Sequence, residues 1–190
     1  MNIFEVVGPV MVGPSSSHTA GAVKIGSISG RLLGEPLVRA EINLHGSFLA
    51  TGDGHGTKKA LVAGLLGMQT DDIRIPQALE IAEERGIVVS FGQAILREAH
   101  PNTAQLILHG RSGQRLEIIG QSLGGSRINI AQLDGIETNF SGESSTLVVY
   151  NEDRPGHVSE VTTMLSNQNI NIASMRLYRS SRGGEAVMVV

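Results

Sequence analysis

Short clusters of glycine separate the aliphatic runs of this chain, and they constrain its fold more than any other feature. Glycine occupies 24 of the 190 positions, whereas about 7% is usual in globular proteins. Because glycine loses much backbone entropy on folding, such an excess indicates many tight turns or places where the backbone approaches a ligand closely. The glycine-rich connections are therefore the first candidates for a functional site.

Helix-like and strand-like patterns alternate along the first two thirds of the chain. Small residues with one apolar side predict a helix from about Thr19 to Leu33, which Gly34 and Pro36 end. Strict alternation from Val38 to Leu44 predicts a half-buried strand. Further helices are expected at 57–66 and 77–84, and strands at 87–91, 104–108, 115–121 and 126–131. Helices on such a sheet form an α+β layer domain.

The last quarter of the chain has a pattern of its own. The polar stretch from Asn139 to Ser145 predicts a linker. A strand (146–150), a helix (155–167) and two strands (170–177 and 186–190) are expected after it. The order β-α-β-β is most of a ferredoxin-like unit. The sequence thus predicts a domain at 1–140, a linker at 141–145 and a second domain at 146–190 that is incomplete at its C-terminus.

Charge and cysteine content exclude several classes of function. The formal net charge is -3, charged residues make up 17%, and no basic stretch occurs, so neither nucleic acid nor a membrane surface is expected as a partner. The chain has no cysteine, which excludes disulfides, a thiol nucleophile and a cysteine-ligated metal in this chain. No signal peptide or long apolar run is evident. A cytoplasmic protein is expected.

The segment Gly13–Thr19 places three serines, a histidine and a threonine at the start of a predicted helix. Hydroxyl groups and free N–H groups beside the positive end of a helix dipole suit a carboxylate or a phosphate. The alternative is an ordinary serine cap, which is common in proteins. One cap does not need Ser15, Ser16 and Ser17 together with His18, so both interpretations stay open.

The segment Gly52–Lys59 has the same setting between a strand and a helix. Its glycines match neither the dinucleotide fingerprint nor the P-loop, so nucleotide binding is not favoured. His55 lies between two glycines, which have no side chains to shield its imidazole. This would allow His55 to reach a substrate as a general base. The alternative is a flexible turn that Thr57 caps. Among the other histidines, His45 is a weaker candidate and His100 is interpreted first as a turn residue.

A third candidate ligand site lies in the tail. Asp153-Arg154-Pro155-Gly156 joins a strand to a helix start, where a tight turn presents N–H groups to an anion such as an amino acid carboxylate. A plain turn explains Pro155 and Gly156 equally well. It does not explain the pairing of this turn with Asn169-Ile170-Asn171, which follows the predicted helix.

These motifs together resemble a known family. Gly13–Thr19, His45-Gly46-Ser47, Gly52–Thr57, His100–Thr103 and Ser122–Gly125 occur in the order found in the beta domain of bacterial iron–sulfur L-serine dehydratases. The tail resembles an ACT domain through Asp153–Gly156 and Asn169–Ile172. The resemblance implies an α+β fold and β-elimination of water from L-serine, which gives pyruvate and ammonia.

The resemblance also implies cofactors, partners and residue roles. A [4Fe-4S] cluster would be held by cysteines of a separate alpha chain, without which this chain is inactive. His55 would remove the α-proton, and Thr57 would orient His55 or hold the substrate carboxylate. The substrate-binding set would be Ser15, Ser16, Ser17, His18 and Thr19.

In the tail, the resemblance implies a regulatory site and pairing of two copies of this chain as a homodimer. The effector-binding residues would be Asn151, Asp153, Gly156, Asn169 and Asn171. The effector would be serine or a monovalent cation. An alternative from another class also follows, because the first domain resembles the allosteric substrate-binding domain of phosphoglycerate dehydrogenases. In that alternative the chain is a non-catalytic sensor of amino acids or anions.

Overall fold

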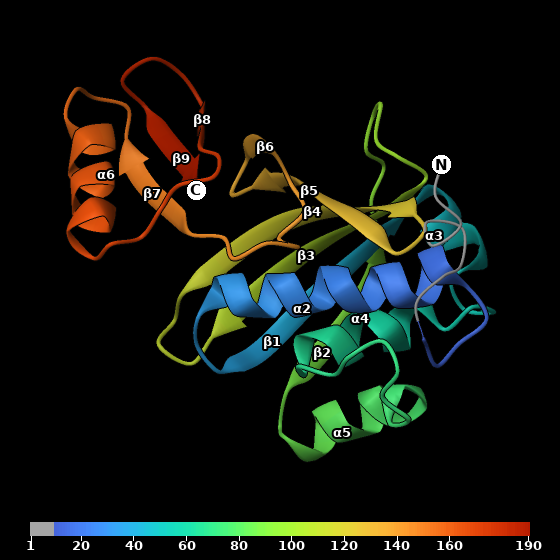
Figure 1. Cartoon of the computed structure of the whole chain (residues 1–190). Helices are drawn as coiled ribbons and strands as arrows, with labels where there is room; N and C mark the ends of the chain where they lie inside the picture. Colours follow the sequence, from blue (N-terminus) through green and yellow to red (C-terminus); the bar gives the residue numbers. More distant parts are fainter. Residues whose placement is uncertain (1–9) are drawn as a thin grey trace.

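The computed structural model describes residues 10–190, which form two separate β-sheets with helices packed on them (Figure 1). This arrangement confirms the expected α+β class. The larger sheet has the strand order β2-β1-β3-β4-β5-β6, and β1 and β2 are its parallel pair. Its strands are β1 (Leu37–His45), β2 (Val88–Gln93), β3 (Asn102–Gly110), β4 (Arg115–Gly124), β5 (Arg127–Leu133) and β6 (Ile136–Phe140).

The helices of the first domain lie on one side of this sheet, with α2 and α4 packed against each other (Figure 1). They are the π-helical turn η1 (Ser16–Gly21), α2 (Ala22–Leu33), α3 (Gly46–Thr51), α4 (Thr57–Leu65), the 3-10 turn η2 (Ile75–Gln77) and α5 (Ala78–Glu84). The predicted helices are confirmed within a few residues. Helix α3 was not predicted.

Glycine has a packing role here besides its role in turns. A Cβ on Gly64 of α4 would overlap the carbonyl oxygen of Val23 in α2 and would lie 2.9 Å from the Cα of Gly26. A Cβ on Gly26 would in turn overlap the carbonyl oxygen of Leu61. The two helix backbones are therefore in direct contact. The aliphatic side chains around this contact and on the sheet below it are fully buried. They include Ile25, Leu33, Leu61, Ile42, Leu44, Leu106 and Ile118.

The opposite face of the large sheet is polar and partly exposed. Asn43 donates a hydrogen bond to Gln105 (3.1 Å), and Gln105 donates one to Glu117 (2.7 Å), across three neighbouring strands. The hydrogen bond from Arg115 is the main reason that the pKa of Glu117 lies below its ordinary value. Alternation of apolar and polar residues thus gives each strand one buried face and one solvent-exposed face.

The smaller sheet forms the tail, with order β7-β9-β8 and helix α6 on its outer side (Figure 1). Its elements are β7 (Val148–Glu152), α6 (His157–Asn167), β8 (Arg176–Arg179) and β9 (Glu185–Val189). The β-α-β-β order is confirmed. The predicted strand at 170–177 is wrong in its first half, because Ile170 to Met175 form an irregular connection and pairing with β9 begins at Arg176.

The tail sheet packs against β6 of the first domain. The Asn139 carbonyl oxygen accepts hydrogen bonds from the Tyr178 hydroxyl (3.0 Å) and from Arg176 (3.2 Å). Burial and the neighbouring Asp134 raise the pKa of Tyr150. Asn139 and Phe140, which the linker prediction included, belong to β6. Their strand anchors the tail rather than separating it from the first domain.

Candidate functional site

Three segments meet at the end of the large sheet where β1 leads into α3 (Figure 1). They are the serine-rich entrance to η1, the helix α3, and the glycine-rich turn before α4. The His18 and His55 rings lie 4.8 Å apart between centroids, and the His18 ring packs edge-on against Phe48 at 5.3 Å. The two loops singled out in the sequence are therefore halves of one site.

The serine-rich entrance is both a cap and part of the site. The Ser15 hydroxyl accepts a hydrogen bond from the backbone N–H of His18 (3.1 Å), as the ordinary-cap interpretation requires. The following turn is π-helical, a geometry often found at functional positions. The Thr19 hydroxyl, which is buried, donates to the carbonyl oxygen of His55 (3.2 Å). This bond ties the two loops together.

Ser16 and Ser17 are half-buried in the same turn. The Ser17 carbonyl accepts a hydrogen bond from the buried Ser122 hydroxyl at 3.0 Å. Gly21 allows that approach, because a Cβ there would overlap Ser122. The Ser122–Gly125 motif thus supports the serine-rich turn from the end of β4.

His55 is half-buried and is held by Thr51 at the end of α3. Its Nδ1 lies 3.0 Å from the Thr51 carbonyl oxygen. A carbonyl oxygen only accepts hydrogen bonds, so Nδ1 carries the proton of the neutral ring. No group within residues 10–190 hydrogen-bonds to Nε2 of His55. That nitrogen therefore keeps a lone pair, as a general base requires.

The His18 ring makes two polar contacts through one nitrogen. Its Nε2 lies 3.1 Å from the Ser47 hydroxyl and 3.1 Å from the Thr51 hydroxyl. Burial lowers the pKa of His18, a hydrogen bond with the Ser47 backbone opposes this, and the neighbouring His55 lowers it further. Because the net shift is downward, His18 is neutral near pH 7. A neutral ring beside His55 does not repel a proton that arrives there.

Thr57 begins α4 directly after the glycine turn and is fully buried. Its hydroxyl has no hydrogen-bond partner within the described residues, and burying an unpaired hydroxyl is costly. The contact that orients His55 is made by Thr51 instead. The second role expected for Thr57, holding a carboxylate at the helix start, stays a prediction. It requires the glycine turn before α4 to move, because the Thr57 side chain is fully buried in this structure.

Sequence reasoning assigned no role to Ser47 or Thr51. Ser47 stands in the quoted His45-Gly46-Ser47 motif, and the two residues are four positions apart, which places them on one face of a helix. That spacing was the one sequence signal for a shared role. It could not be used, because the segment was not predicted to be helical.

The other histidines have structural contacts. His45 Nδ1 lies 3.1 Å from the Ala94 carbonyl oxygen and 3.3 Å from the Leu96 backbone nitrogen, so it holds the loop that follows β2. His100 accepts a hydrogen bond from the Asn102 N–H (3.1 Å), which agrees with the predicted turn.

The five expected effector residues of the tail are not brought together within one chain. Asn151, Asp153 and Gly156 lie at or beyond the C-terminal end of β7, where Asp153 accepts hydrogen bonds from Arg179 and Gly183. Asn169 and Asn171 follow the C-terminal end of α6, beside the start of β7. The length of the tail sheet therefore separates the two groups.

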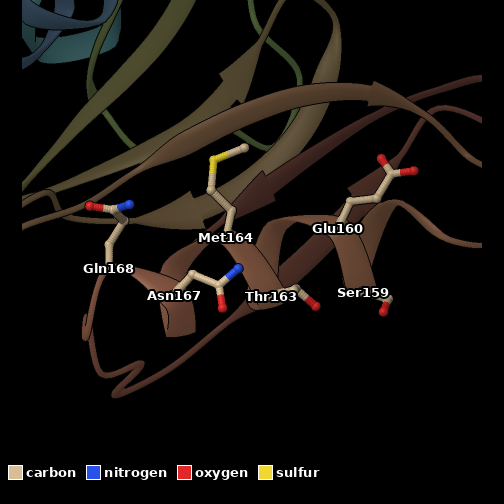
Figure 2. A pocket seen from close by; sticks show the side chains of 6 residues that line it. All are labelled: Ser159, Glu160, Thr163, Met164, Asn167 and Gln168. Carbon is tan, nitrogen blue, oxygen red and sulfur yellow. The ribbon is translucent and has the colours of Figure 1, made fainter.

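Two hollows lie on the tail and not over the histidines. One, of about 500 Å³, is lined by six side chains on adjacent turns of α6 (Figure 2). The other, of about 650 Å³, lies between the linker and the connection before β8. Neither includes His18 or His55 in its lining.

Residues 10–190 contain neither a cluster of metal-ligating residues nor a membrane-spanning helix. No cluster of three or more histidine, cysteine, aspartate or glutamate residues in this range could hold a metal ion. None of the helices in the same range is long and apolar enough to cross a membrane. The residues of the site therefore do not fit an iron–sulfur cluster within this chain.

Comparison with known proteins identifies the family. Residues 2–112 match the family model described as serine dehydratase beta chain, and residues 145–190 match the ACT domain model. The chain is 39% identical over 189 residues to a probable L-serine dehydratase beta chain from Bacillus subtilis, covering 100% of this chain and 86% of the relative. It is 40% identical over 173 residues to the L-serine dehydratase beta chain of Peptoniphilus asaccharolyticus, covering 90% and 78%.

A more distant similarity extends to another enzyme. A D-3-phosphoglycerate dehydrogenase from Archaeoglobus fulgidus is 27% identical over 172 residues, which cover 89% of this chain but 32% of that protein. The beta-chain relatives match at higher identity and over most of their own length. The chain therefore belongs to the serine dehydratase beta chain family and carries an ACT domain as its tail.

Proposed function

We propose that the chain is the beta subunit of an L-serine dehydratase and that it contributes the proton acceptor and the carboxylate cradle of the active site. The observation that carries the proposal is the position of His55 two residues before Thr57, the first residue of α4. Within residues 10–190, no group hydrogen-bonds to Nε2 of His55, and the buried Thr57 hydroxyl has no partner either. In L-serine, the Cα–H that must be removed lies beside a carboxylate. A base and an anion site two residues apart suit these two groups.

The proton transfer follows from this arrangement. The substrate carboxylate accepts hydrogen bonds from N–H groups at the start of α4 and from the Thr57 hydroxyl, helped by the positive end of the helix dipole. Nε2 of His55 takes the proton from Cα, the electron pair forms the Cα–Cβ double bond, and the Cβ–O bond breaks. The enamine product hydrolyses to pyruvate and ammonia.

Departure of the substrate hydroxyl requires a group that this chain does not provide. The chain has no cysteine, and cysteine thiolates are the usual ligands of iron–sulfur clusters. Under the proposal an alpha chain holds the [4Fe-4S] cluster and docks at the histidine site. The beta subunit alone is then inactive.

The decisive experiment is anaerobic reconstitution of this chain with its alpha chain, with pyruvate formation from L-serine as the readout. His55→Ala is expected to lower kcat by about 100-fold or more, since general-base catalysis contributes about 10²–10⁴-fold. The matched control is His109→Ala, which removes a histidine on the polar sheet face beside Glu41 and should leave kcat within about twofold of wild type. Near-normal turnover of the His55 variant would remove the assignment.

The phosphoglycerate dehydrogenase relative supports a second candidate function, a non-catalytic anion sensor. In that case the start of α4 binds an effector and His55 moves no proton. The same reconstitution separates the two functions. A sensor would bind L-serine without forming pyruvate, whatever alpha chain is supplied.

For the tail, we infer that two copies pair so that Asp153 and Gly156 of one copy face Asn169 and Asn171 of the other. The separation of these residues within one chain supports this proposal, because one small effector cannot reach both groups in a single tail. Sedimentation should show a dimer that L-serine or a monovalent cation tightens, and Asn171→Ala should abolish that response. A monomer at all effector concentrations would contradict it.

A further inference from the structure

Thr51 lies within hydrogen-bond distance of both histidine rings. Its carbonyl oxygen lies 3.0 Å from Nδ1 of His55, and its hydroxyl oxygen lies 3.1 Å from Nε2 of His18. It ends α3, whose Phe48 is fully buried. Both contacts are thus presented by a helix that is anchored in the core.

The hydrogen bonds of Thr51 determine where His18 carries its proton. The Thr51 hydroxyl donates its single proton to the Ser47 carbonyl oxygen (3.0 Å). Toward His18 it can then only accept, so Nε2 of His18 is the donor. Nδ1 of His18 is left with a lone pair, and the Ser15 hydroxyl lies 3.5 Å from it. Ser15 already accepts the His18 N–H, so its own proton is free for this contact.

The same residue fixes the opposite tautomer in His55. The Thr51 carbonyl oxygen has no proton to give, so His55 carries its proton on Nδ1 and exposes the lone pair on Nε2. The two neighbouring rings therefore present different nitrogens as donors. A residue that sets a tautomer decides which nitrogen is available as a base.

We infer that Thr51 is a positioning residue that holds His18 as the Nε2–H tautomer and His55 as the Nδ1–H tautomer, so that Nε2 of His55 is the proton acceptor. The inference rests on the proposed function for its catalytic consequence. When Nε2 of His55 takes a proton, the Thr51 carbonyl stabilises the resulting cation through Nδ1–H. His18 stays neutral beside it.

A purely structural role for Thr51 predicts something different. Threonine hydroxyls often bond the carbonyl four residues earlier in a helix, and Thr162 does so with Val158 at 2.9 Å in α6. If Thr51 only completed α3, its loss would lower stability without changing either tautomer. Thr162→Val is therefore the matched control, because it removes the same type of bond far from the site.

The tautomers can be read directly in the full-length chain with ¹⁵N-labelled histidine. Two-bond ¹H–¹⁵N NMR spectra, recorded well above the ordinary histidine pKa of about 6.5, should show His18 as Nε2–H and His55 as Nδ1–H. In Thr51→Val, His18 should shift toward the Nδ1–H form, because Nε2 then keeps only the Ser47 hydroxyl as a partner, and that hydroxyl can donate as well as accept. Thr51→Ser should restore the wild-type pattern, and Thr162→Val should not alter it.

Turnover supplies the second readout. With the alpha chain present, Thr51→Val should lower kcat by about tenfold while KM changes less than about threefold, since small misplacements of a catalytic group cost rate more than binding. Thr51→Ser should recover most of the loss. Wild-type spectra with either tautomer reversed would overturn the inference, and so would unchanged spectra or unchanged kcat in Thr51→Val.

The two proposals can fail separately. If His55→Ala retains turnover while the spectra show the expected tautomers, the catalytic role fails and the hydrogen-bond assignment stands. If His55→Ala is inactive but the tautomers differ from those expected, the role of Thr51 fails alone.

Discussion

The helices α4 and α6 differ in how they are packed, although each begins directly after a glycine-containing turn. Helix α4 buries six of its nine residues, whereas α6 buries none of its eleven. Most helical stability in proteins comes from packing rather than propensity. The first domain therefore offers a rigid frame for the histidine site, and the tail offers a helix that can move at low cost.

In the tail, the sheet rather than the helix provides the buried packing and the attachment to the first domain. Strand β9 is buried from Ala186 to Val189, and the Asn139 carbonyl binds Tyr178 and Arg176 from β8. The surface of α6 remains exposed and carries polar side chains together with Met164 (Figure 2). Regions that respond to ligands are drawn from the less stable parts of a protein. This contrast fits a fixed catalytic domain joined to a responsive tail.

The largest expected effect tests the rigid frame. Gly64→Ala should lower the free energy of unfolding by about 3 kcal/mol, because the new Cβ overlaps the Val23 carbonyl and lies 2.6 Å from the Ser27 backbone nitrogen. Alanine is the better helix former by about 1 kcal/mol, so propensity alone predicts the opposite sign. Urea denaturation measures the change.

Two controls calibrate that result. Gly30→Ala in α2 places its Cβ 3.3 Å from the Leu65 carbonyl oxygen, a tight contact that should lower stability less. Ser166→Ala on the exposed side of α6 should change stability by less than about 0.5 kcal/mol. Equal effects in α4 and α6 would remove the contrast between the two helices.

A smaller effect is expected where the two regions join. Tyr178→Phe removes one hydrogen bond to the Asn139 carbonyl and should weaken attachment of the tail by about 1 kcal/mol. Faster hydrogen exchange in β8 and β9, with unchanged exchange in β3 and β4, is the expected observation. Thr163→Val on the outer face of α6 (Figure 2) is the control. Uniform acceleration in both sheets would show that the regions unfold as one unit.

Local patterns were sufficient for the elements whose own periodicity matches their burial. Helix α2 and strand β1 were predicted because their apolar residues recur at 3.6 and 2 residues. Helix α3 was missed because it has six residues and owes its position to distant contacts, such as the Ser47 N–H on the Pro101 carbonyl (2.7 Å). Strand β6 was not predicted at all, because it is short and its last residues, Asn139 and Phe140, adjoin a polar, glycine-containing stretch.

The same limit applied to the site. His18 and His55 stand in unusual glycine- and serine-rich segments, so each was visible as a candidate. Their contact was not predictable from spacing, because it depends on how α3 turns after β1. Ser47 and Thr51 have functional meaning only once that helix is placed.

The smallest expected effect concerns the tail alone and depends on pH. Hydrogen bonds from the Gly183 N–H and from Arg179 hold the pKa of Asp153 below its ordinary value. A lowered folded-state pKa means that the charged form stabilises the tail above the unfolded value of about 3.9, and that this stabilisation is lost as the pH falls through the folded-state pKa. Asp153→Asn should therefore speed exchange of the Gly183 and Gly184 amides a few-fold at pH 7, and the difference from wild type should disappear toward pH 2. Asp72→Asn is the matched control, because Arg74 lowers the pKa of Asp72 to about 2 within the first domain, so its loss should leave the tail amides unchanged. A difference that persists undiminished in acid would mean that the side-chain shape of Asp153, and not its charge, holds this loop.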